Sequence, residues 1–377
     1  MQILAAARVF DGADFHADHA LVLQDGRIAD LVPRAQLAPA IAPPAPAPGS
    51  LLAPGFIDVQ VNGGGGALLN AVPDVPCVAR IAAAHRRFGT TGLLPTLITD
   101  DVAKLEALAD AAADAMAVPG VLGFHLEGPF LSAARPGVHP KNHIRAPDAR
   151  SRAALLRFAR HGRSLATLAP ETVPEGFVAE LVAAGLRVAA GHTAADSDAL
   201  ARAADEGLTG VTHLFNAMLP VSARAPGVPG RAFDDPRLTA GIICDGLHVD
   251  PLVLRMAFRL MGPDRLMLVT DAMPSVGSDL AEFDLPGLRV RLVDGKLTAP
   301  DGTLAGAHLD MAQAVRNALA LMNAPLGDAL AMASRVPARF LGLDGIRGRL
   351  ARGFAADIVE LDANLAATAT WIAGGRA

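Results

Sequence analysis

The feature of the sequence that most constrains its fold is a repeated alternation of short apolar runs with amphipathic helical stretches. Eight runs end in polar or glycine residues, and they are Gly55–Asn62, Gly92–Thr99, Val121–Glu127, Leu165–Glu171, Leu186–His192, Gly210–Asn216, Gly241–Asp245 and Leu266–Asp271. Such runs are typical of strands buried on both faces of a parallel sheet. Helix candidates lie between them at Val75–Phe88, Val102–Ala117, Ser151–His161, Val178–Ala184, Asp198–Glu206 and Pro251–Met261. Eight β/α units over about 220 residues predict an α/β fold, a (β/α)8 TIM-like barrel.

A doubly wound open sheet is the alternative, because it also alternates strands with helices. That fold needs a glycine-rich phosphate loop after an early strand. The run Gly63–Gly66 follows the first predicted strand, but it is not a GxGxxG motif and opens no convincing helix. The barrel is therefore the preferred architecture.

The two ends of the chain have a different pattern. Apolar runs within residues 1–50 are separated by Asp11-Gly12 and Asp25-Gly26, and Asp-Gly between such runs is a hairpin signal. Ala38–Gly49 is rich in proline and alanine and reads as a surface linker, and Gly353–Leu361 resembles another strand. We predict that residues 1–50 and 345–377 form one small β-sandwich-like domain beside a barrel of residues 51–344.

Two further elements are expected after the eighth barrel strand. Asp294-Gly295 predicts an inserted hairpin, and Met311–Met322 and Leu326–Leu341 predict helices that complete the outer layer of the barrel.

The composition excludes several classes of protein. A formal charge of −5 argues against a nucleic-acid binder, and 51% hydrophobic against 19% charged residues argues against disorder. Two distant cysteines, Cys77 and Cys244, exclude a disulfide scaffold and fit a reducing compartment. No apolar stretch reaches the roughly 18 residues of a membrane span, and residues 1–12 lack the features of a signal peptide. We expect a cytoplasmic protein without a nucleic-acid or membrane partner.

Side chains that bind metals or transfer protons end most of the predicted strands. They are Gln60, Asn62, Thr99, His125, Glu127, Glu171, His192, His213, Asn216, Asp245, His248 and Asp271. Because barrels carry their active sites at the carboxyl ends of the strands, we expect these groups to lie together. Glu127, His192 and His213 supply three metal ligands and leave a position open, as in hydrolytic zinc sites. Asp271 would then be the general base that acts on water.

Structural roles compete with functional ones at single positions. His125 alternates with Glu127 and is a ligand, the partner of a ligand or a core residue. Glu171 is either functional or a cap or solvated loop residue. Arg224 lies in a loop of proline, glycine and alanine, where a solvated surface arginine is as compatible with the sequence as a functional one. For the three ligands and the base together, a purely structural explanation requires four independent coincidences.

Eight segments carry a resemblance to a known family. They are PGFIDVQVNG at 54–63, GFHLEGPF at 123–130, LAPE at 168–171, AGHT at 190–193, THLFNAM at 212–218, DGLHVD at 245–250, VTDA at 269–272 and GTLAG at 302–306. Together they resemble the N-acetylglucosamine-6-phosphate deacetylases of the amidohydrolase superfamily, over about residues 50–310. Each segment alone is weak, but the ordered set is specific.

The resemblance implies a role for each matching position. Glu127, His192 and His213 match the family's metal ligands, Asp271 its catalytic base and acid, and His139 a histidine that polarises the acetamide carbonyl. Val138, Asn216, Ala217, His248, Leu304, Ala305 and Gly306 match groups that bind the phosphorylated sugar. Arg224 matches an arginine that reaches the phosphate in the neighbouring subunit, which implies a homodimer.

The first strand departs from the wider superfamily. Many members carry His-x-His there for a second metal, whereas this chain has Gln60-x-Asn62. Neutral amides are poor ligands for zinc, so we predict one divalent ion per subunit, with zinc as the first choice and iron, manganese or cobalt as alternatives. The resemblance implies removal of the acetyl group from N-acetylglucosamine 6-phosphate. A related amidohydrolase acting on N-acetylgalactosamine 6-phosphate or another N-acyl substrate, and a non-catalytic scaffold of the same fold, are the competing hypotheses.

Overall fold

Eight parallel strands form a closed barrel in the computed structural model, which describes residues 1–41, 43–285 and 287–377. In order around the barrel they are β7 (Phe56–Val61), β10 (Thr90–Ile98), β11 (His125–Glu127), β12 (Leu165–Leu168), β13 (Arg187–Ala190), β14 (Gly210–Val211), β15 (Thr239–Ile243) and β16 (Leu266–Val269). The last strand returns to the first through a parallel bridge between Val61 and Ala272, and the Asp271 amide donates to the Gln60 carbonyl at 3.0 Å. The predicted barrel is confirmed, and this closure excludes the open sheet.

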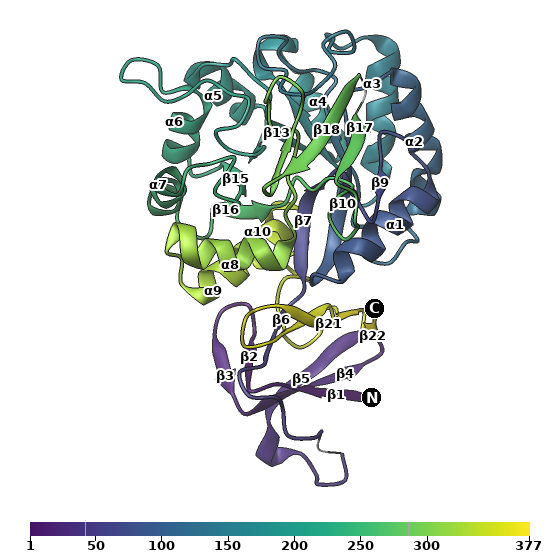
Figure 1. The fold of residues 1–377 in the computed structure, drawn as a ribbon, viewed down its shortest axis with the longest axis vertical. Coiled ribbons are helices and arrows are strands. Elements are labelled where there is room, and N and C mark those ends of the chain that lie inside the picture. The colour runs from purple at the N-terminus through teal and green to yellow at the C-terminus, as the bar shows by residue number, and fades with distance from the viewer. Residues whose placement is uncertain (42, 286) are drawn as a thin grey trace.

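Helices cover the outside of the barrel (Figure 1). They are α1 (Val75–Arg86), α2 (Val102–Ala115), α3 (Ala149–Leu156), α4 (Phe177–Ala184), α5 (Ser197–Asp205), α6 (Gly227–Asp234), α7 (Pro251–Met261), α8 (Met311–Met322), α9 (Leu326–Ala333) and α10 (Arg335–Phe340), with short 3-10 turns at η2 (Arg157–Arg160) and η3 (Pro170–Thr172). A further 3-10 turn, η1 (Arg34–Gln36), follows β5 (Arg27–Pro33) in the terminal domain. None of the helices in these described ranges is long and apolar enough to cross a bilayer.

Aspartate residues begin most of these helices. The side chains of Asp74, Asp101, Asp148, Asp196, Asp250 and Asp310 each accept a hydrogen bond from a backbone amide in the first turn. Such a cap stabilises a helix by about 1 kcal/mol, because it satisfies an amide that has no partner within the helix. The local sequence therefore specifies where the helices start as well as which faces they bury.

Two helical segments differ from the prediction. The sequence of α6 contains two glycines and a proline, so its pattern indicates a loop, yet Val228, Pro229 and Ala232 are buried and hold it against the barrel. The single helix expected over Leu326–Leu341 is two helices, because Ser334 leaves the helical conformation and its hydroxyl donates to the Leu330 carbonyl at 2.6 Å.

The two chain ends form a separate β domain below the barrel in Figure 1. One sheet has the order β1 (Gln2–Ala5), β4 (His19–Gln24), β5 (Arg27–Pro33), and the other has β22 (Gly375–Arg376), β21 (Ala367–Ile372), β20 (Ile358–Leu361), β6 (Leu51–Pro54), β2 (Arg8–Phe10), β3 (Phe15–Ala17). The expected small domain is present. Strand β6 pairs with β2 and β20, so the terminal sheet extends four residues beyond the position 50 that we expected as its boundary. Gly55 then leads directly into β7.

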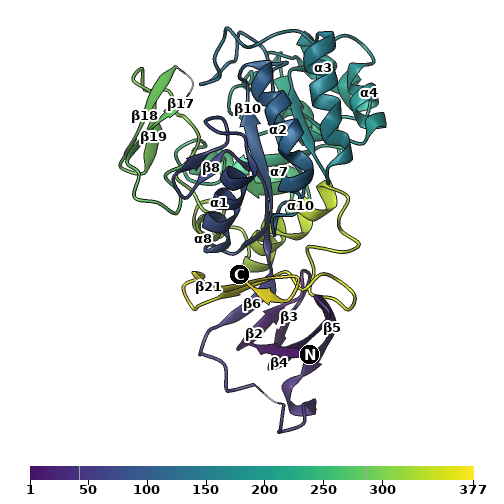
Figure 2. The same cartoon turned by 90° about the vertical axis from the view of Figure 1, so that its right-hand side faces the viewer.

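A three-stranded sheet follows β16, where the sequence predicts an inserted hairpin. It consists of β17 (Glu282–Leu285), β18 (Leu288–Val293) and β19 (Lys296–Thr298) and stands beside the barrel, on the part away from the terminal domain (Figure 2). Asp294 and Gly295 have φ values of 50° and 77°, which a type I′ hairpin turn requires. A small antiparallel pair, β8 (Gly63–Gly64) and β9 (Ala67–Leu68), follows β7.

Candidate active site and metal centre

A cavity of about 460 Å³ lies at the carboxyl ends of the barrel strands. It is lined by Asn62, Ile98, Glu127, Ala134, Arg135, Pro136, Gly137, Val138, His139, His192, His213, Asn216, Ala217, Ile243, His248, Asp271, Met273, Thr303, Leu304 and Gly306. We expected the ionisable and polar side chains at the strand ends to lie together, and this arrangement agrees with that expectation. Most of the side chains singled out in the sequence therefore line one open cavity.

Three candidate ligands converge at the floor of this cavity. His213 Nε2 lies 2.9 Å from Glu127 Oε1, His192 Nε2 lies 3.3 Å from the same oxygen, and the two imidazole nitrogens are 3.1 Å apart. A tetrahedral zinc ion with bonds of about 2.0–2.1 Å holds its ligand atoms about 3.4 Å apart. The atoms of Glu127, His192 and His213 are already close to that spacing, so this set fits a divalent ion.

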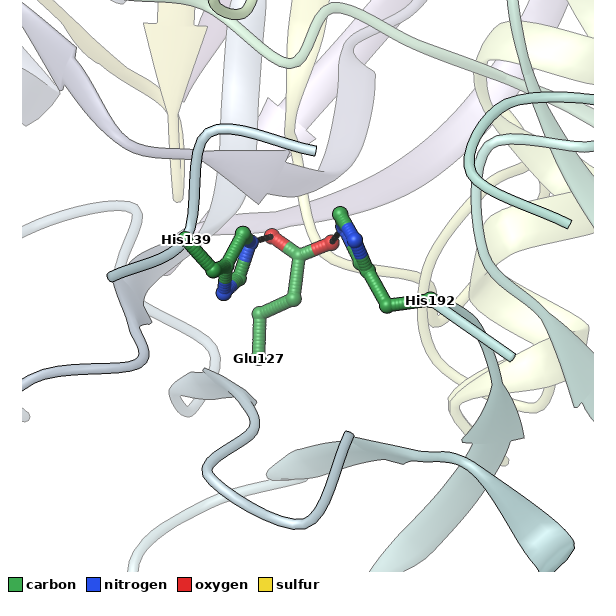
Figure 3. A group of neighbouring side chains, drawn as sticks. All are labelled: Glu127, His139 and His192. Carbon is green, nitrogen blue, oxygen red and sulfur yellow. Dashed lines mark ion pairs between the residues drawn. The ribbon is translucent and has the colours of Figure 1, made fainter. Parts of the chain in front are cut away.

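His139 approaches the same carboxylate from the other side. Glu127, His139 and His192 also form a possible metal site, with ligand atoms within 4.8 Å of one another, and Figure 3 shows the carboxylate between the two rings. The His139 Nε2 is 4.0 Å from Glu127 Oε2, which is longer than the distances to the other two histidines. We therefore favour His213 as the third ligand and leave His139 free to face a bound molecule.

Hydrogen bonds set the ionisation state of these groups. Burial opposes ionisation of Glu127, but hydrogen bonds from His192 and His213 hold the pKa of its carboxyl well below the usual range. Burial, followed by the neighbouring His192, lowers the pKa of His139 well below its usual value, so that ring is neutral. The ionised carboxylate is the form of Glu127 that binds a cation.

The backbone at three strand ends adopts an unusual conformation. His192, His213 and Asp271 have φ values of 47°, 31° and 50°, in the left-handed region that non-glycine residues rarely adopt. The His192 ring is fixed further, because its Nδ1 lies 3.1 Å from the Arg135 carbonyl, the geometry of an N–H donor that leaves Nε2 free as a ligand. This local strain turns the side chains into the cavity and is characteristic of functional sites.

Asp271 is held by two amide side chains from the first strand. Asn62 Nδ2 donates to its Oδ1 at 2.6 Å, and Gln60 Nε2 donates both to that oxygen at 3.2 Å and to Glu127 at 3.2 Å. Burial, followed by the Glu127 carboxylate, raises the pKa of Asp271 to about 6. Gln60 and Asn62 therefore donate hydrogen bonds to carboxylates. Metal-ligating histidines at these positions would instead offer a nitrogen lone pair to the ion.

The far wall of the cavity carries polar groups from the ends of β14 and β15. His248 Nδ1 lies 2.6 Å from Asp245 Oδ2, and the side-chain Nδ2 of Asn216 donates to the His213 carbonyl at 3.3 Å. Burial would raise the pKa of Asp245, but the hydrogen bond and charge of His248, together with hydrogen bonds from the His248 and Leu247 backbone amides, hold the pKa below its usual value. His248 is thus oriented with one ring nitrogen toward Asp245.

Most of the expected substrate-binding residues line the cavity, and two do not. Val138, Asn216, Ala217, His248, Leu304 and Gly306 line it. Ala305 is fully buried behind the wall, and Arg224 lies exposed on a loop outside the cavity. The proposed contact of Arg224 therefore has to be made outside its own site.

Two ambiguous residues have structural partners. His125 is fully buried, its Nε2 lies 2.8 Å from the Thr167 hydroxyl, and burial lowers its pKa to about 4. Glu171 accepts hydrogen bonds from the Thr193 hydroxyl and the Ala194 amide, both at 2.6 Å. The first stabilises the barrel interior and the second anchors the loop that follows His192.

Several lining residues were not singled out in the sequence. Among them are Ile98, Arg135, Ile243 and Met273. Arg135 lies four residues before His139. The one sequence signal that could have pointed to it is its position between the candidate site residues Glu127 and His139. The apolar three carry no chemical signal and read as core residues.

Comparisons with known proteins agree with this geometry. The model of the amidohydrolase family matches residues 51–375. The N-acetylgalactosamine-6-phosphate deacetylase of a Shewanella species is 44% identical over 86% of this chain and 82% of its own length. The human N-acetylglucosamine-6-phosphate deacetylase is 40% identical over 86% and 83%. The crystal structure of N-acetylglucosamine-6-phosphate deacetylase from Pasteurella multocida is 31% identical, with a TM-score of 0.96 over 100% of this chain and 99% of that one.

A family match over most of the barrel, strong similarity along most of each relative, and a shared fold all lead to one assignment. The chain belongs to the amidohydrolase family, whose members are metal-dependent hydrolases.

Proposed function

We propose that this protein hydrolyses the acetamide of N-acetyl-D-glucosamine 6-phosphate to give D-glucosamine 6-phosphate and acetate. The observation that carries the proposal is the convergence of Glu127, His192 and His213 beside the Asp271 carboxyl, at the floor of a cavity with a polar far wall. The names of the human and Pasteurella relatives support the same substrate.

The chain's own residues divide the work of the reaction. Glu127, His192 and His213 would hold a divalent ion, which would supply Lewis acidity and make water a stronger acid. Asp271 accepts the proton of the attacking water and delivers it to the amine that leaves. His139 faces the acetamide and donates a hydrogen bond to its carbonyl oxygen as negative charge develops there.

Contacts remote from the amide orient the substrate. Asn216, the Ala217 backbone and His248 bind the sugar phosphate from the far wall, while Val138 and the loop Leu304–Gly306, including Ala305, enclose the sugar. Binding energy from such contacts is used to place the amide against the catalytic groups. Arg224 reaches the phosphate in the neighbouring subunit of a homodimer, which agrees with its exposed position outside its own cavity.

We propose one ion per subunit, with zinc as the native metal and iron, manganese or cobalt as functional substitutes. The Gln60 and Asn62 amides donate hydrogen bonds to Glu127 and Asp271, so they are engaged where a second ion would need ligands. Metal analysis of the purified protein should find one tightly bound ion per chain. Two tightly bound ions would contradict this proposal. A cytoplasmic location is in keeping with two free, buried cysteines.

A second substrate has a specific observation in its favour. The Shewanella relative, at 44% identity, acts by its name on N-acetylgalactosamine 6-phosphate, the C4 epimer. The deciding experiment is release of free amine by the metal-loaded protein from both epimers and from unphosphorylated N-acetylglucosamine. Release from the phosphorylated gluco compound supports the proposal, release from the galacto compound transfers the chemistry to the epimer, and release from neither rejects both.

A further inference from the structure

The wall of the cavity has two unlike arcs. In the order of strands around the barrel, Asn216 and His248 follow β14 and β15, whereas Ile98 ends β10 and Met273 follows β16. Val138 and Leu304 add apolar surface to the arc that runs from β16 through β7 and β10 to β11. Ile243 at the end of β15 is the large apolar lining residue on the other arc. Glu127 at the end of β11 and Asp271 after β16 stand at the two limits of the apolar arc, and Asn62 after β7 is a polar side chain within it. His192 and His213 follow β13 and β14.

Ile98 and Met273 form the inner part of the apolar arc. Their side chains are 4% and 2% exposed, so they reach the cavity from within the packed protein. Ile98 is in register with Glu127 on the adjacent strand, and Met273 is two residues after Asp271. Each apolar side chain is therefore next to a group that carries the chemistry.

Both residues are held rigidly. The Asn70 side chain accepts from the Ile98 amide and donates to the Ile98 carbonyl, both at 3.0 Å. The Met273 amide donates to the Ala307 carbonyl at 3.2 Å, and a Cβ on Gly306 would lie 2.5 Å from the Met273 methyl carbon. Behind them, Phe283, Leu285, Val290 and Leu297 of the three-stranded sheet complete one apolar cluster with Ile98 and Met273. Ile98 and Met273 therefore have little space into which they could move away from a bound molecule.

We propose that Ile98 and Met273 form the acyl subsite of the enzyme and limit the acyl chain to acetyl. The inference rests on the proposed function, because it assumes an N-acyl sugar phosphate whose phosphate contacts the arc of Asn216 and His248. A secondary amide is planar and trans, so its acyl methyl points away from the sugar. With the carbonyl carbon at Asp271 and the sugar toward the polar arc, the methyl group meets the apolar arc.

The expected discrimination follows from the geometry of a rigid apolar pocket. One extra methylene in such a pocket changes specificity by about 10–200-fold. We therefore expect wild-type kcat/KM to fall by at least about tenfold from N-acetyl- to N-propionyl-glucosamine 6-phosphate, and again to the N-butyryl compound. Replacing Met273 with a smaller residue should reduce this preference for acetyl, because the space released accepts the longer chain.

The test compares kcat/KM for the three acyl compounds, on the C4 epimer that the wild type prefers. Met273→Ala should raise the propionyl-to-acetyl ratio by about tenfold or more, and the milder Ile98→Val should raise it in the same direction. Val290→Ala is the matched control, because Val290 belongs to the same apolar cluster but does not line the cavity. Metal content and thermal unfolding confirm that each variant is folded.

The outcomes separate the inference from the function on which it rests. An unchanged ratio in folded Met273→Ala and Ile98→Val, with similar losses for every acyl length, would overturn the acyl subsite while the deacetylase assignment stands. An equal shift in Val290→Ala would also overturn it, because the effect would then come from general loosening. Failure of the metal-loaded wild type to hydrolyse either acetylated epimer would overturn the proposed function and this inference with it.

Discussion

The mouth of the barrel and the terminal β domain bury opposite kinds of side chain. The terminal domain has an apolar core in which Val9, Leu21, Ile28 and Trp371 pack between its sheets. At the mouth, the buried residues include Asp58, Gln60, Asn62, Glu127, His139, His192 and His213. Burying polar groups costs free energy unless each finds a partner, whereas burying apolar side chains stabilises the fold. The terminal domain therefore contributes stability without chemistry, and the mouth concentrates chemistry at a cost in stability.

Backbone conformation follows the same division. In the terminal domain, the left-handed non-glycine residues are Asp18, Asp25, Leu365 and Ala373. Two of them, Asp25 and Ala373, adjoin Gly26 and Gly374 in tight turns, where such φ values are expected. At the mouth, His192, His213 and Asp271 adopt them at strand ends. Residues in this region cost about 1–3 kcal/mol each and persist where the surrounding structure holds them. Changes at the mouth should thus affect catalysis more than folding, and changes in the terminal domain should do the reverse.

Among the changes considered for the two regions, removal of the metal from the barrel mouth should have the largest effect on activity. Dialysis against a chelator is expected to abolish amine release, because Glu127, His192 and His213 would be left without the ion that their atoms are spaced to hold. It should also lower the thermal midpoint, since a ligand at a thousand times its Kd stabilises the folded state by about 4 kcal/mol. Added zinc should restore both. Full activity in protein shown by elemental analysis to be metal-free would contradict the assignment of a metal centre.

Asp271→Asn should reduce kcat by about 10²–10⁴-fold, the usual contribution of a general acid–base group. Metal content and KM should change little, because the amide keeps the shape of the side chain. Asp279→Asn is the control, since Asp279 is an exposed aspartate on the same loop. Turnover near that of the wild type would remove Asp271 from the mechanism.

The sequence predicts much of the barrel because its signals are local. Runs such as Leu266–Asp271 and caps such as Asp250 place strands and helices within a few residues of their observed ends. Helix α6 escaped prediction, because its stability comes from burial against the barrel rather than from its own residues. Strands β1 and β2 are close in sequence but belong to different sheets. This division was not predictable, because it depends on pairing with distant strands.

The site was predictable where chemistry marks it. Glu127, His192, His213 and Asp271 stand out as ionisable groups at strand ends, and their distances fit that hypothesis. Ile98 and Met273 were not predictable, because an apolar side chain at a cavity wall has the same sequence signal as one in the core. Only the three-dimensional arrangement separates the two.

Arg224→Ala should mainly weaken substrate binding. Hydrogen bonds to charged groups contribute about 1.5–3 kcal/mol, so KM for the phosphorylated sugar should rise by about 10–100-fold with a smaller change in kcat. Arg352→Ala, at an exposed position near the terminal domain, should leave KM unchanged. If Arg224 acts across a homodimer, sedimentation should show a dimer. An unchanged KM in Arg224→Ala, or a fully active monomer, would reject this role.

Leu21→Ala tests the terminal domain, where we expect a loss of stability without a loss of kcat. Leu21 is fully buried in the core of the terminal domain, and loss of such a leucine destabilises a protein by about 2–5 kcal/mol. At a temperature where the variant remains folded, its kcat should stay close to that of the wild type. Denaturant unfolding and steady-state kinetics on the same preparation provide both values. A large fall in kcat in fully folded protein would show that the terminal domain takes part in catalysis.

The smallest expected effect is a change of stability with pH that comes from Asp58. This carboxyl is buried where the last barrel strand, β16, meets the first, β7. Asp58 accepts hydrogen bonds from the Thr270 hydroxyl and amide and from the Gln60 amide, yet burial raises its pKa to about 7. Because this folded-state pKa lies above the unfolded value near 3.8, the folded protein retains a proton that the unfolded chain releases. The stabilisation is complete at low pH and is lost as the pH rises toward 7. At 1.36 kcal/mol per pKa unit, the wild type should lose about 2 kcal/mol of unfolding free energy between pH 5 and 7.

Asp58→Asn should remove this contribution to the slope, because its amide cannot release a proton in this range. Urea unfolding at pH 5, 6 and 7 measures the slope. The difference between variant and wild type cancels the titration of Asp271, whose pKa is also raised, and of the proposed metal ligands, because both proteins contain them. Asp11 in the terminal domain is the opposite case. Burial opposes its ionisation, but hydrogen bonds from the Asp14 amide and His16 lower its pKa, so its stabilisation is lost only in acid, as the pH falls through that lowered value. Asp11→Asn should therefore keep the wild-type slope between pH 5 and 7. If both variants lost it, the pH dependence would not belong to the buried carboxyl. The contrast between a barrel with many buried polar groups and a terminal domain with a mainly apolar core would then fail at this point.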